Sequence, residues 1–348
     1  MELGSDYDLS LNELNTTDDN LFKRLNKFDY VMFDSGRSAI RSVLRCHGEV
    51  LLPEYICDSV INCFVPESIV FYKINEDFSI DCEDLLNKVS DKTQLIYIAH
   101  YFGAVHQSEV LKCIRTGIRD VNIVVVEDTT QSLFSGGEHI GDRFVASIRK
   151  WMPIPVGGIA YSYTKLPSIE CLKASTDNQR IYAMVLKHLF LNNGLDCNSL
   201  YRGIFESCER NFDTSTPMLI SDLAHFIISC VNVSDLIERR KRNYRKLRYR
   251  LKQLGVSPAV ALMENDVPFV FPIRVDDRDA FRAFLIENRI YCAVHWPFDG
   301  FKGGQRRQAI RNADTLISLP IDQRYDDTHI DYLADVISKY RGDLTFSR

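Results

Sequence analysis

Short apolar runs alternate with amphipathic segments over the first half of the chain. Apolar and β-branched residues gather in five runs, which we predict to be buried strands at residues 30–33, 50–52, 69–74, 94–99 and 122–126. Before and between them, apolar positions at helical spacing predict helices at residues 20–27, 37–46, 59–64, 81–89 and 108–116. Strands that alternate with helices are typical of an α/β fold with a mostly parallel sheet covered by helices on both faces.

The second half begins with helical periodicity and changes near residue 268. Helices are predicted at residues 169–174, 178–191, 219–233 and 234–254, the last with Ser234 as its N-cap and Gly255 after its end. Shorter elements follow, with strands at residues 269–273, 291–296 and 315–319 and helices at residues 278–287 and 329–341. We therefore predict an α/β large domain of residues 28–242 and a smaller C-terminal α+β domain of residues 243–348. Residues 1–27 form a polar lead-in, and we expect its first 20 residues to be weakly ordered.

Composition and charge exclude several classes of function. A net charge of -5 and 45% hydrophobic residues are ordinary for a globular protein and give no reason to expect nucleic acid or a membrane as partner. The basic run at residues 239–250 could contact nucleic acid, but it also suits the solvated face of a long helix. The start of the chain lacks the features of a signal peptide, and no apolar run reaches the roughly 18 residues that span a bilayer. Ten cysteines show no zinc spacing, so we expect reduced thiols, no metal site and a cytoplasmic protein.

Four predicted loops that follow strands are rich in polar residues or glycine. They are residues 35–37, 53–55 and 100–103 and the segment that begins at Asp128. Because ligands bind beyond the carboxyl ends of parallel strands, we expect all four at one edge of the sheet. The first loop leads into a helix whose unpaired N–H groups would bind a phosphate well. The alternative is an ordinary helix start with Ser35 as N-cap.

An acid at the end of a buried strand and a lysine among apolar residues are the two poles of a pyridoxal phosphate (PLP) site. Asp128 would keep the ring nitrogen protonated, and Lys150 would bond to the cofactor's aldehyde and later move protons. Gln131 could contact the ring's phenolic oxygen, and Tyr55 or Tyr101 could cover one face of the ring. Taken singly, Asp128 could instead cap the following turn, and Lys150 could be a surface lysine.

Residues near these two poles have open interpretations. Ser147 is a contact to the phosphate or the lysine, or a hydroxyl that supports a turn. Arg149 is a hook for an anion or a solvated charge. His295 and Trp296 are candidate substrate contacts, and His295 could equally be a structural histidine.

Together these segments resemble the DegT/StrS-type aminotransferases, which are PLP enzymes of the aspartate-aminotransferase fold. The resemblance covers roughly residues 28–340 and matches in order and spacing. It is carried by the motifs SGRSA (35–39), PEY (53–55), HYFG (100–103), EDTTQ (127–131), SIRK (147–150), GG (157–158), VHWP (294–297) and SLPIDQRY (318–325). The resemblance implies that Lys150 carries PLP, that Asp128 pairs with the pyridinium and that Gln131 contacts the ring oxygen.

The same resemblance implies further residue roles. Gly36 and Arg37, with Ser38 beside them, take the phosphate-binding positions. Arg37 replaces a small hydroxyl residue of the family, so the phosphate would be held differently. The ring-covering aromatic of the family falls near Cys57, two residues after Tyr55. Residues 211–216 take the place of a partner-subunit loop that usually contains Asn-x-Arg.

The function implied by the resemblance is the transfer of an amino group from an amino acid such as glutamate to a nucleotide-linked keto sugar, for amino-sugar or surface-polysaccharide biosynthesis. Enzymes of this family are homodimers with active sites at the interface. Two alternatives stay open. A cysteine-desulfurase-like lyase also places Asp-x-x-Gln before its lysine, and His100 could be its stacking histidine. The second alternative is a non-catalytic PLP-binding protein with the same fold.

Overall fold

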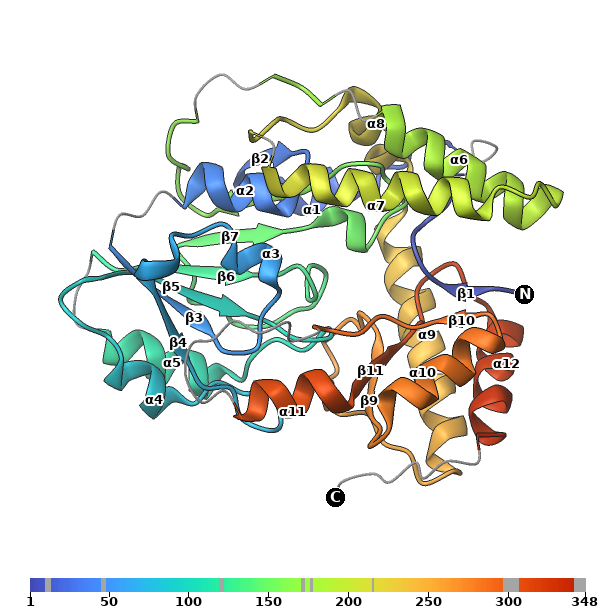
Figure 1. Ribbon diagram of the computed structural model, residues 1–348. Coiled ribbons are helices and arrows are strands. Elements are labelled where there is room, and N and C mark those ends of the chain that lie inside the picture. Colours follow the sequence, from blue (N-terminus) through green and yellow to red (C-terminus); the bar gives the residue numbers. More distant parts are fainter. Residues whose placement is uncertain are drawn as a thin grey trace.

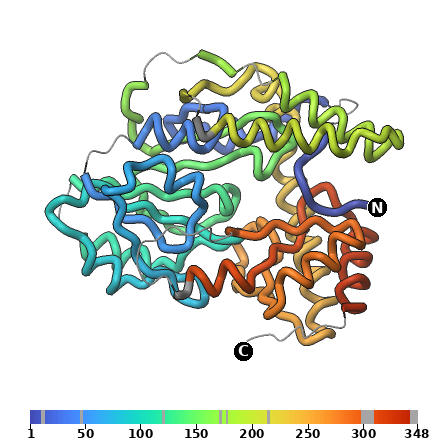
Figure 2. Tube along the Cα trace, viewed as in Figure 1, coloured from blue at the N-terminus to red at the C-terminus, as the bar shows by residue number. Residues whose placement is uncertain are grey.

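The structure is a computed structural model that describes residues 1–9, 14–44, 48–118, 122–169, 173–175, 178–214, 216–296 and 307–340. Figure 1 shows a larger part around a central sheet and a smaller part formed by the C-terminal elements. In Figure 2 the N-terminal segment, in blue, lies beside the red C-terminal elements, because strand β1 pairs with strand β10. Within the described part of the chain, no helix is both long and apolar enough to cross a membrane.

A seven-stranded sheet forms the centre of the larger part. Its order is β2-β8-β7-β6-β5-β3-β4, and only β8 runs antiparallel to its neighbours. The strands are β2 (Asp29–Phe33), β3 (Glu49–Pro53), β4 (Ile69–Tyr72), β5 (Thr93–Ala99), β6 (Val124–Asp128), β7 (Arg143–Ala146) and β8 (Gly158–Ser162). The prediction of a mostly parallel sheet is confirmed. The sequence pattern missed β7 and β8, because both are short and one follows a glycine pair that signals a loop.

Helices bury both faces of this sheet. In β7, Val145 points into one hydrophobic core while Phe144 and Ala146 point into the other. The first face is covered by α2 (Gly36–Val43), α3 (Asp58–Ile61), α4 (Cys82–Asn87) and α5 (Ser108–Gly117), with the short 3-10 turn η1 (Pro66–Ser68) before β4. The second face is covered by α1 (Leu21–Leu25), α6 (Asn178–Asn193), α7 (Asn198–Thr214) and α8 (Asp222–Cys230).

The smaller part has a hydrophobic core of its own. The smaller part contains β9 (Phe271–Arg274), α10 (Arg278–Glu287), β10 (Ile290–Tyr291), α11 (Arg307–Thr315), β11 (Leu316–Leu319) and α12 (Asp327–Ser338). Strand β9 pairs with β11 in antiparallel orientation, and Ala309 of α11 packs into the first core of the larger part. The long helix α9 (Val233–Lys252) joins both parts, since Leu236 packs into the second core and Leu247 into the smaller one. The domain boundary at residue 242 falls inside this helix and stays a prediction.

The N-terminal segment is packed, so the expectation of weak order was wrong for the residues the structure describes. β1 (Leu3–Gly4) pairs in parallel with β10, and the side chain of Leu3 is fully buried in the smaller core. Leu9 packs into the second core of the larger part. Two well-placed leucines in a polar stretch supply this burial, and the overall polarity of the segment hid them.

Other predicted elements need correction. The helix expected at residues 169–174 is absent from its described residues, because Ala174 instead makes a β-bridge with Leu219; residues 170–172 lie outside the description. The strand expected at residues 291–296 is limited to the end of β10 and a bridge at Ala293. Helices α7 and α11 were not predicted, and α9 is capped by Asn232 rather than Ser234. The glycine-rich stretch that leads to residue 304 lies outside the described residues.

Candidate active site

The predicted loops meet at the carboxyl edge of the sheet. β5 and β6 pair in parallel and end level with each other, so the loops that follow them are neighbours. The Tyr101 hydroxyl donates to the carbonyl oxygen of Tyr55 at 2.6 Å, which joins the loops after β3 and β5. The backbone N–H of Phe102 donates to Oε1 of the buried Gln131 at 2.7 Å, which joins the loops after β5 and β6. The convergence inferred from sequence is confirmed.

The glycine loop before α2 lies directly against the segment that carries the lysine. Ser35 is the N-cap of α2, and its Oγ accepts from the backbone N–H of Ser38 at 3.1 Å. A Cβ atom on Gly36 would lie 3.3 Å from Cβ of Ser147, and one on Gly158 would lie 2.0 Å from the carbonyl oxygen of Ser35. These close approaches bring the start of α2 and the turn after β7 together, and at Gly158 only glycine fits.

Asp128 is a carboxyl group that the protein surrounds with hydrogen-bond donors. The Tyr97 hydroxyl and the Thr130 backbone N–H each donate to it at 2.8 Å. Burial nevertheless raises the pKa of Asp128, because the charged form loses its hydration. A cation placed beside this carboxylate would offset that effect. The hydrogen bond from Thr130 also makes Asp128 a turn cap, so the capping alternative is realised alongside any other role.

Lys150 ends the 3-10 turn η2 (Ile148–Lys150) that follows β7. Its neighbours Ile148, Trp151 and Met152 are fully buried and fix the backbone, while the Lys150 side chain itself is exposed. Nε1 of Trp151 donates to the carbonyl of Thr130 at 2.7 Å, which ties this turn to the loop after β6. The expected apolar surroundings are therefore present, and the lysine faces out of them.

Lys150 opens into a cavity of about 740 Å³ between the larger part, the smaller part and the N-terminal segment. Among the predicted site residues, Lys150, Arg149 and His295 line this cavity. The other predicted site residues do not line it: Gly36, Arg37, Ser38, Tyr55, Asp128, Gln131, Ser147 and Trp296. A backbone hydrogen bond connects the two sets, since the N–H of Lys150 donates to the carbonyl oxygen of Ser147 at 3.4 Å. The N–H of Ser147 in turn donates to Oγ1 of Thr130 at 3.0 Å.

Positive charge dominates the cavity. Nine lysines and arginines line it against five acids, an excess of four positive charges in a chain whose net charge is -5. The cations are Arg149, Lys150, Arg180, Lys187, Arg202, Arg210, Arg240, Arg282 and Arg324, and the acids are Glu2, Asp6, Glu206, Glu209 and Asp322. Such a cavity favours anionic ligands over cationic ones.

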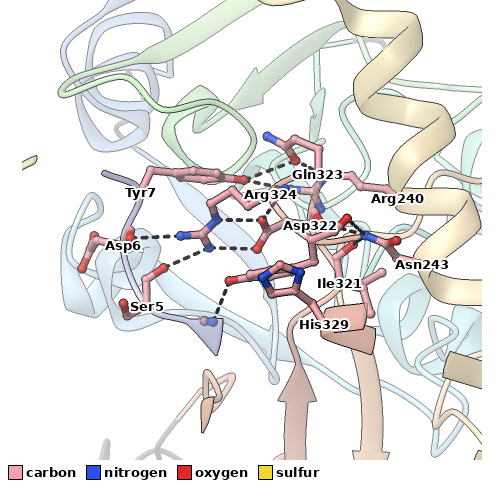
Figure 3. A network of polar contacts seen from close by, with 12 residues as sticks. Ser5, Asp6, Tyr7, Arg240, Asn243, Ile321, Asp322, Gln323, Arg324 and His329 are labelled. Carbon is pink, nitrogen blue, oxygen red and sulfur yellow. Dashed lines mark hydrogen bonds and ion pairs between the residues drawn. The ribbon is translucent and has the colours of Figure 1, made fainter. Parts of the chain in front are cut away.

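The N-terminal segment forms one wall of the cavity, and Figure 3 shows Ser5, Asp6 and Tyr7 of this segment beside Arg324. Arg324 binds the carboxylate of Asp322 at 2.8 and 2.9 Å and donates to the backbone carbonyls of Ser5 and Asp6 at 3.3 and 3.1 Å. Its guanidinium carbon also lies 4.3 Å from the ring centre of Tyr7. Sequence reasoning missed this wall, because its contacts join the two ends of the chain.

Helix α7 supplies a second missed feature. Residues 211–216 were expected to be a loop, but residues 211–214 belong to α7. This helix directs Glu209 toward Arg149 at 2.7 Å and Arg180 at 2.9 Å. Its buried residues Tyr201, Phe205, Cys208 and Phe212 recur at helical spacing, and that periodicity was the signal in the sequence that could have predicted the helix.

The predicted aromatic residues form one cluster. The Tyr55 ring centre lies 5.2 Å from that of Trp296 and 5.8 Å from that of Tyr101. His295 lies at the cavity end of this cluster, and its Nδ1 is 2.8 Å from Oγ of Ser318. Burial, and then the charge of Lys150, lower the pKa of His295 to about 3, so this ring is neutral at ordinary pH. His295 therefore makes a structural contact, to Ser318, and also lines the cavity, so both alternatives for this residue stay open.

A buried cluster of His100, Glu127 and His139 lies behind Asp128, and its side-chain atoms are close enough together to ligate a metal ion. His100 and His139 instead donate to the same Glu127 oxygen, and the backbone N–H groups of Ile140 and Gly141 donate to the other at 2.6 and 2.7 Å. Burial opposes ionisation of Glu127, but the histidine hydrogen bonds outweigh it and hold its pKa well below the usual range. Hydrogen bonds alone account for this cluster.

The arrangement meets the requirements of PLP at three points. The first turn of α2, where Gly36 closely approaches Ser147, is the positive end of a helix and suits a phosphate. Asp128 can take a protonated ring nitrogen as its missing cation. Lys150 offers an exposed amine at the cavity. Beside it, the buried Nε of Arg149 has no hydrogen-bond acceptor.

Comparisons with known proteins agree at the level of fold. No protein-family model and no curated protein sequence matches the chain. A sugar aminotransferase from Micromonospora echinospora, CalS13, is 17% identical over 89% of this chain and 87% of its own, with a TM-score of 0.62. NtdA from Bacillus subtilis, solved with bound cofactor PMP, is 17% identical over 91% of this chain and 74% of its own, with a TM-score of 0.64. A DegT DnrJ EryC1 StrS aminotransferase from Brucella abortus is 14% identical over 93% and 88%, with a TM-score of 0.62. The chain therefore has the fold of these aminotransferases.

Proposed function

We propose that the chain is a PLP-dependent aminotransferase that moves an amino group from an amino acid such as glutamate to a nucleotide-linked keto sugar. The observation that carries this proposal is the position of Lys150. It opens into a cationic cavity and is tied by hydrogen bonds, through Ser147 and Thr130, to the half-buried Asp128. A DegT/StrS-type membership and a role in amino-sugar or surface-polysaccharide biosynthesis are parts of the same proposal.

The proposed roles follow from the surroundings of each residue. PLP supplies an electron sink when it is bound. Asp128 holds a proton on the ring nitrogen, because a buried carboxylate without a cation is costly. Gln131, whose Oε1 is fixed by Phe102, keeps its amide directed at one place and contacts the ring oxygen. Lys150 moves a proton at its amine nitrogen, and Ser147 and the start of α2 hold the phosphate.

The cavity favours an anionic substrate. Its excess of four positive charges suits the carboxylates of glutamate and the diphosphate of a nucleotide-linked sugar. His295 and Trp296 are proposed substrate contacts, with His295 acting as a neutral hydrogen-bonding group. The cavity gives less support to a desulfurase, because burial raises the pKa of its cysteine, Cys292, to about 12 and leaves no reactive thiolate there.

The proposal includes a homodimer with the active site at its interface, and a cytoplasmic location. Residues 211–214, which take the place of the family's partner-subunit loop, belong to helix α7. Sedimentation of the PLP-loaded protein tests the dimer.

A spectroscopic screen tests the activity. The purified protein is loaded with PLP, glutamate and other amino donors are added in turn, and the absorption of the bound cofactor is followed. We expect conversion to the pyridoxamine form with at least one donor and its reversal by a keto sugar. Lys150→Ala should abolish both changes, whereas Lys165→Ala, at an exposed lysine outside the cavity lining, should leave them intact. An unchanged response in Lys150→Ala would refute the assignment.

A further inference from the structure

Three arginines from distant parts of the chain converge on one carboxylate. Arg37 is in the first turn of α2, Arg149 precedes Lys150, and Arg180 is in α6. Their nitrogen atoms lie 3.6, 2.7 and 2.9 Å from the carboxylate of Glu209 on α7. The ring of Phe212, one turn later on α7, lies 5.9 Å from the guanidinium carbon of Arg37 and 5.0 Å from that of Arg149. We call Arg37, Arg149 and Arg180 the arginine site.

The arginine site is buried, whereas the carboxylate that fills it is accessible. The side chains of Arg37, Arg149 and Arg180 are 17%, 8% and 7% exposed, against 41% for Glu209. Buried guanidinium groups require an anion, because their mutual repulsion is weakly screened. Glu209 is thus the member of the group that can leave, provided that another anion takes its place.

The charge balance favours a dianion as that replacement. Arg180 also binds Asp6 at 2.8 Å, so three guanidinium groups face two carboxylates and one positive charge is in excess. A phosphate monoester carries a charge close to -2 at neutral pH. If it replaced Glu209, the three guanidinium groups would be matched by the phosphate and Asp6. The buried Nε of Arg149, which has no acceptor, would gain one.

The location connects the arginine site to the proposed cofactor site. Arg37 directly follows Gly36, whose Cα faces Ser147, and Arg149 is adjacent to Lys150. Arg149, Arg180 and Glu209 all line the cavity. A phosphate here would lie between the start of α2 and the cavity.

We propose that the arginine site binds the phosphate of a small phosphate monoester, and that Glu209 occupies this site in the free protein as a competing anion. The identification of the ligand as PLP rests on the proposed function, whereas the phosphate site does not. A phosphate carried by a substrate has the same chemistry. Glu209 therefore sets how much phosphate ligand is needed to fill the site.

Calorimetric titration with inorganic phosphate in chloride buffer tests the site. The titrations use Lys150→Ala protein, so that no covalent attachment contributes. Adding Glu209→Gln should raise the phosphate affinity about tenfold or more, because the competitor is gone while the donors stay. Glu206→Gln is the matched control, since Glu206 is an exposed acid on the same helix and lines the same cavity. Equal or weaker phosphate binding in Glu209→Gln than in Glu206→Gln would overturn the proposal.

Thermal unfolding keeps the proposal testable if Glu209→Gln folds poorly. The variant should unfold at a lower temperature in chloride and recover in phosphate of equal ionic strength, because the arginine site then regains an anion. Equal effects of chloride and phosphate would contradict it. Glu209→Asp, whose shorter side chain reaches the arginines less well, should give an intermediate phosphate affinity. A wild-type affinity in both Glu209→Asp and Glu209→Gln would also count against the site.

The source of the phosphate is resolved by two further ligands. If the site takes the phosphate of PLP, Glu209→Gln should strengthen the binding of PLP but not of pyridoxal, and inorganic phosphate should compete with PLP. If it takes a substrate phosphate, inorganic phosphate should bind more tightly in Glu209→Gln without displacing PLP. Both results uphold the arginine site. A failure of the proposed function is seen separately, as absence of PLP attachment to Lys150 in otherwise wild-type protein.

Discussion

Two regions flank Lys150, and they are built on different principles. On one side, Asp128 and Gln131 lie at a sheet edge, held by short hydrogen bonds from Tyr97, Thr130 and Phe102. On the other side, the arginine site is held by charge, and its anion comes from the partly exposed Glu209. The first region is close to rigid and carries a single ionisable acid. The second can exchange its anion, so we assign chemistry to the first and ligand entry to the second.

Replacing Asp128 should have the largest effect. Asp128→Asn removes the negative charge beside the proposed ring nitrogen, and we expect kcat/KM for transamination to fall about a thousandfold. Steady-state kinetics measure this. Tyr97→Phe removes one hydrogen bond to the same carboxylate and should cost less than about tenfold. Similar losses in both variants would mean that the Asp128 charge has no special role.

A substitution at Gly158 tests the close contact between the start of β8 and the residue before α2, the helix that carries Arg37. A Cβ atom there would lie 2.0 Å from the carbonyl oxygen of Ser35, which is backbone and cannot rotate away. Gly158→Ala should therefore lower the free energy of unfolding by about 3 kcal/mol, measured by urea denaturation. A loss below about 1 kcal/mol would show that the start of α2 is free to move, and would weaken the contrast between a rigid and an exchangeable region.

The histidine cluster beneath the first region should give a smaller, pH-dependent effect. Glu127→Gln places an amide where His100 and His139 donate, so we expect a loss of about 2 kcal/mol in the free energy of unfolding at neutral pH. The folded-state pKa of Glu127 is depressed, so its contribution is present above its unfolded pKa of about 4.3 and is lost as the pH falls below it.

Denaturation from pH 7 to pH 3 measures this change, with Glu138→Gln as the control. Glu138 is an exposed acid in the loop after β6, next to His139, and it pairs with Lys112 at 2.7 Å. The difference between wild type and Glu127→Gln should shrink as the pH falls, while Glu138→Gln stays near wild type throughout. If the difference in free energy of unfolding between wild type and Glu127→Gln grew as the pH fell, it would contradict the account of Glu127.

The smallest effect is expected in the second region. Gly203 lies inside α7, and nothing is within 4 Å of the position of an added Cβ atom. Gly203→Ala should raise the free energy of unfolding by about 0.5–1 kcal/mol through helix propensity alone. Phosphate affinity should not change, because Glu209 keeps its place. A gain in stability accompanied by weaker phosphate binding would mean that α7 must bend or fray for the anion to exchange.

Sequence periodicity and loop chemistry predicted the first region because its parts are local. The strands before Asp128 and the glycine loop are short apolar runs, and parallel pairing alone brings their ends together. The bounds of α10, residues 278–287, match the prediction in full, because the sequence of this helix is amphipathic and Asp277 caps its start. The mostly parallel sheet followed from the same reasoning.

The second region could not be predicted in this way. Arg37, Arg149, Arg180 and Glu209 meet only through tertiary packing of α2, η2, α6 and α7. A charged residue on a helix ordinarily indicates a solvated face. The N-terminal wall was hidden for a similar reason. Ser5 and Asp6 are polar residues whose order depends on Arg324, at the opposite end of the chain.

The central claim is that Lys150 is the residue to which PLP becomes attached. The cavity holds a rival lysine, Lys187, which is buried and whose pKa is lowered to about 8 by that burial. The most direct measurement is reduction of the PLP-loaded protein with borohydride, followed by proteolysis and mass spectrometry of the labelled peptide. We predict a single pyridoxyl group on Lys150. A label on Lys187, or no label at all, would contradict the account.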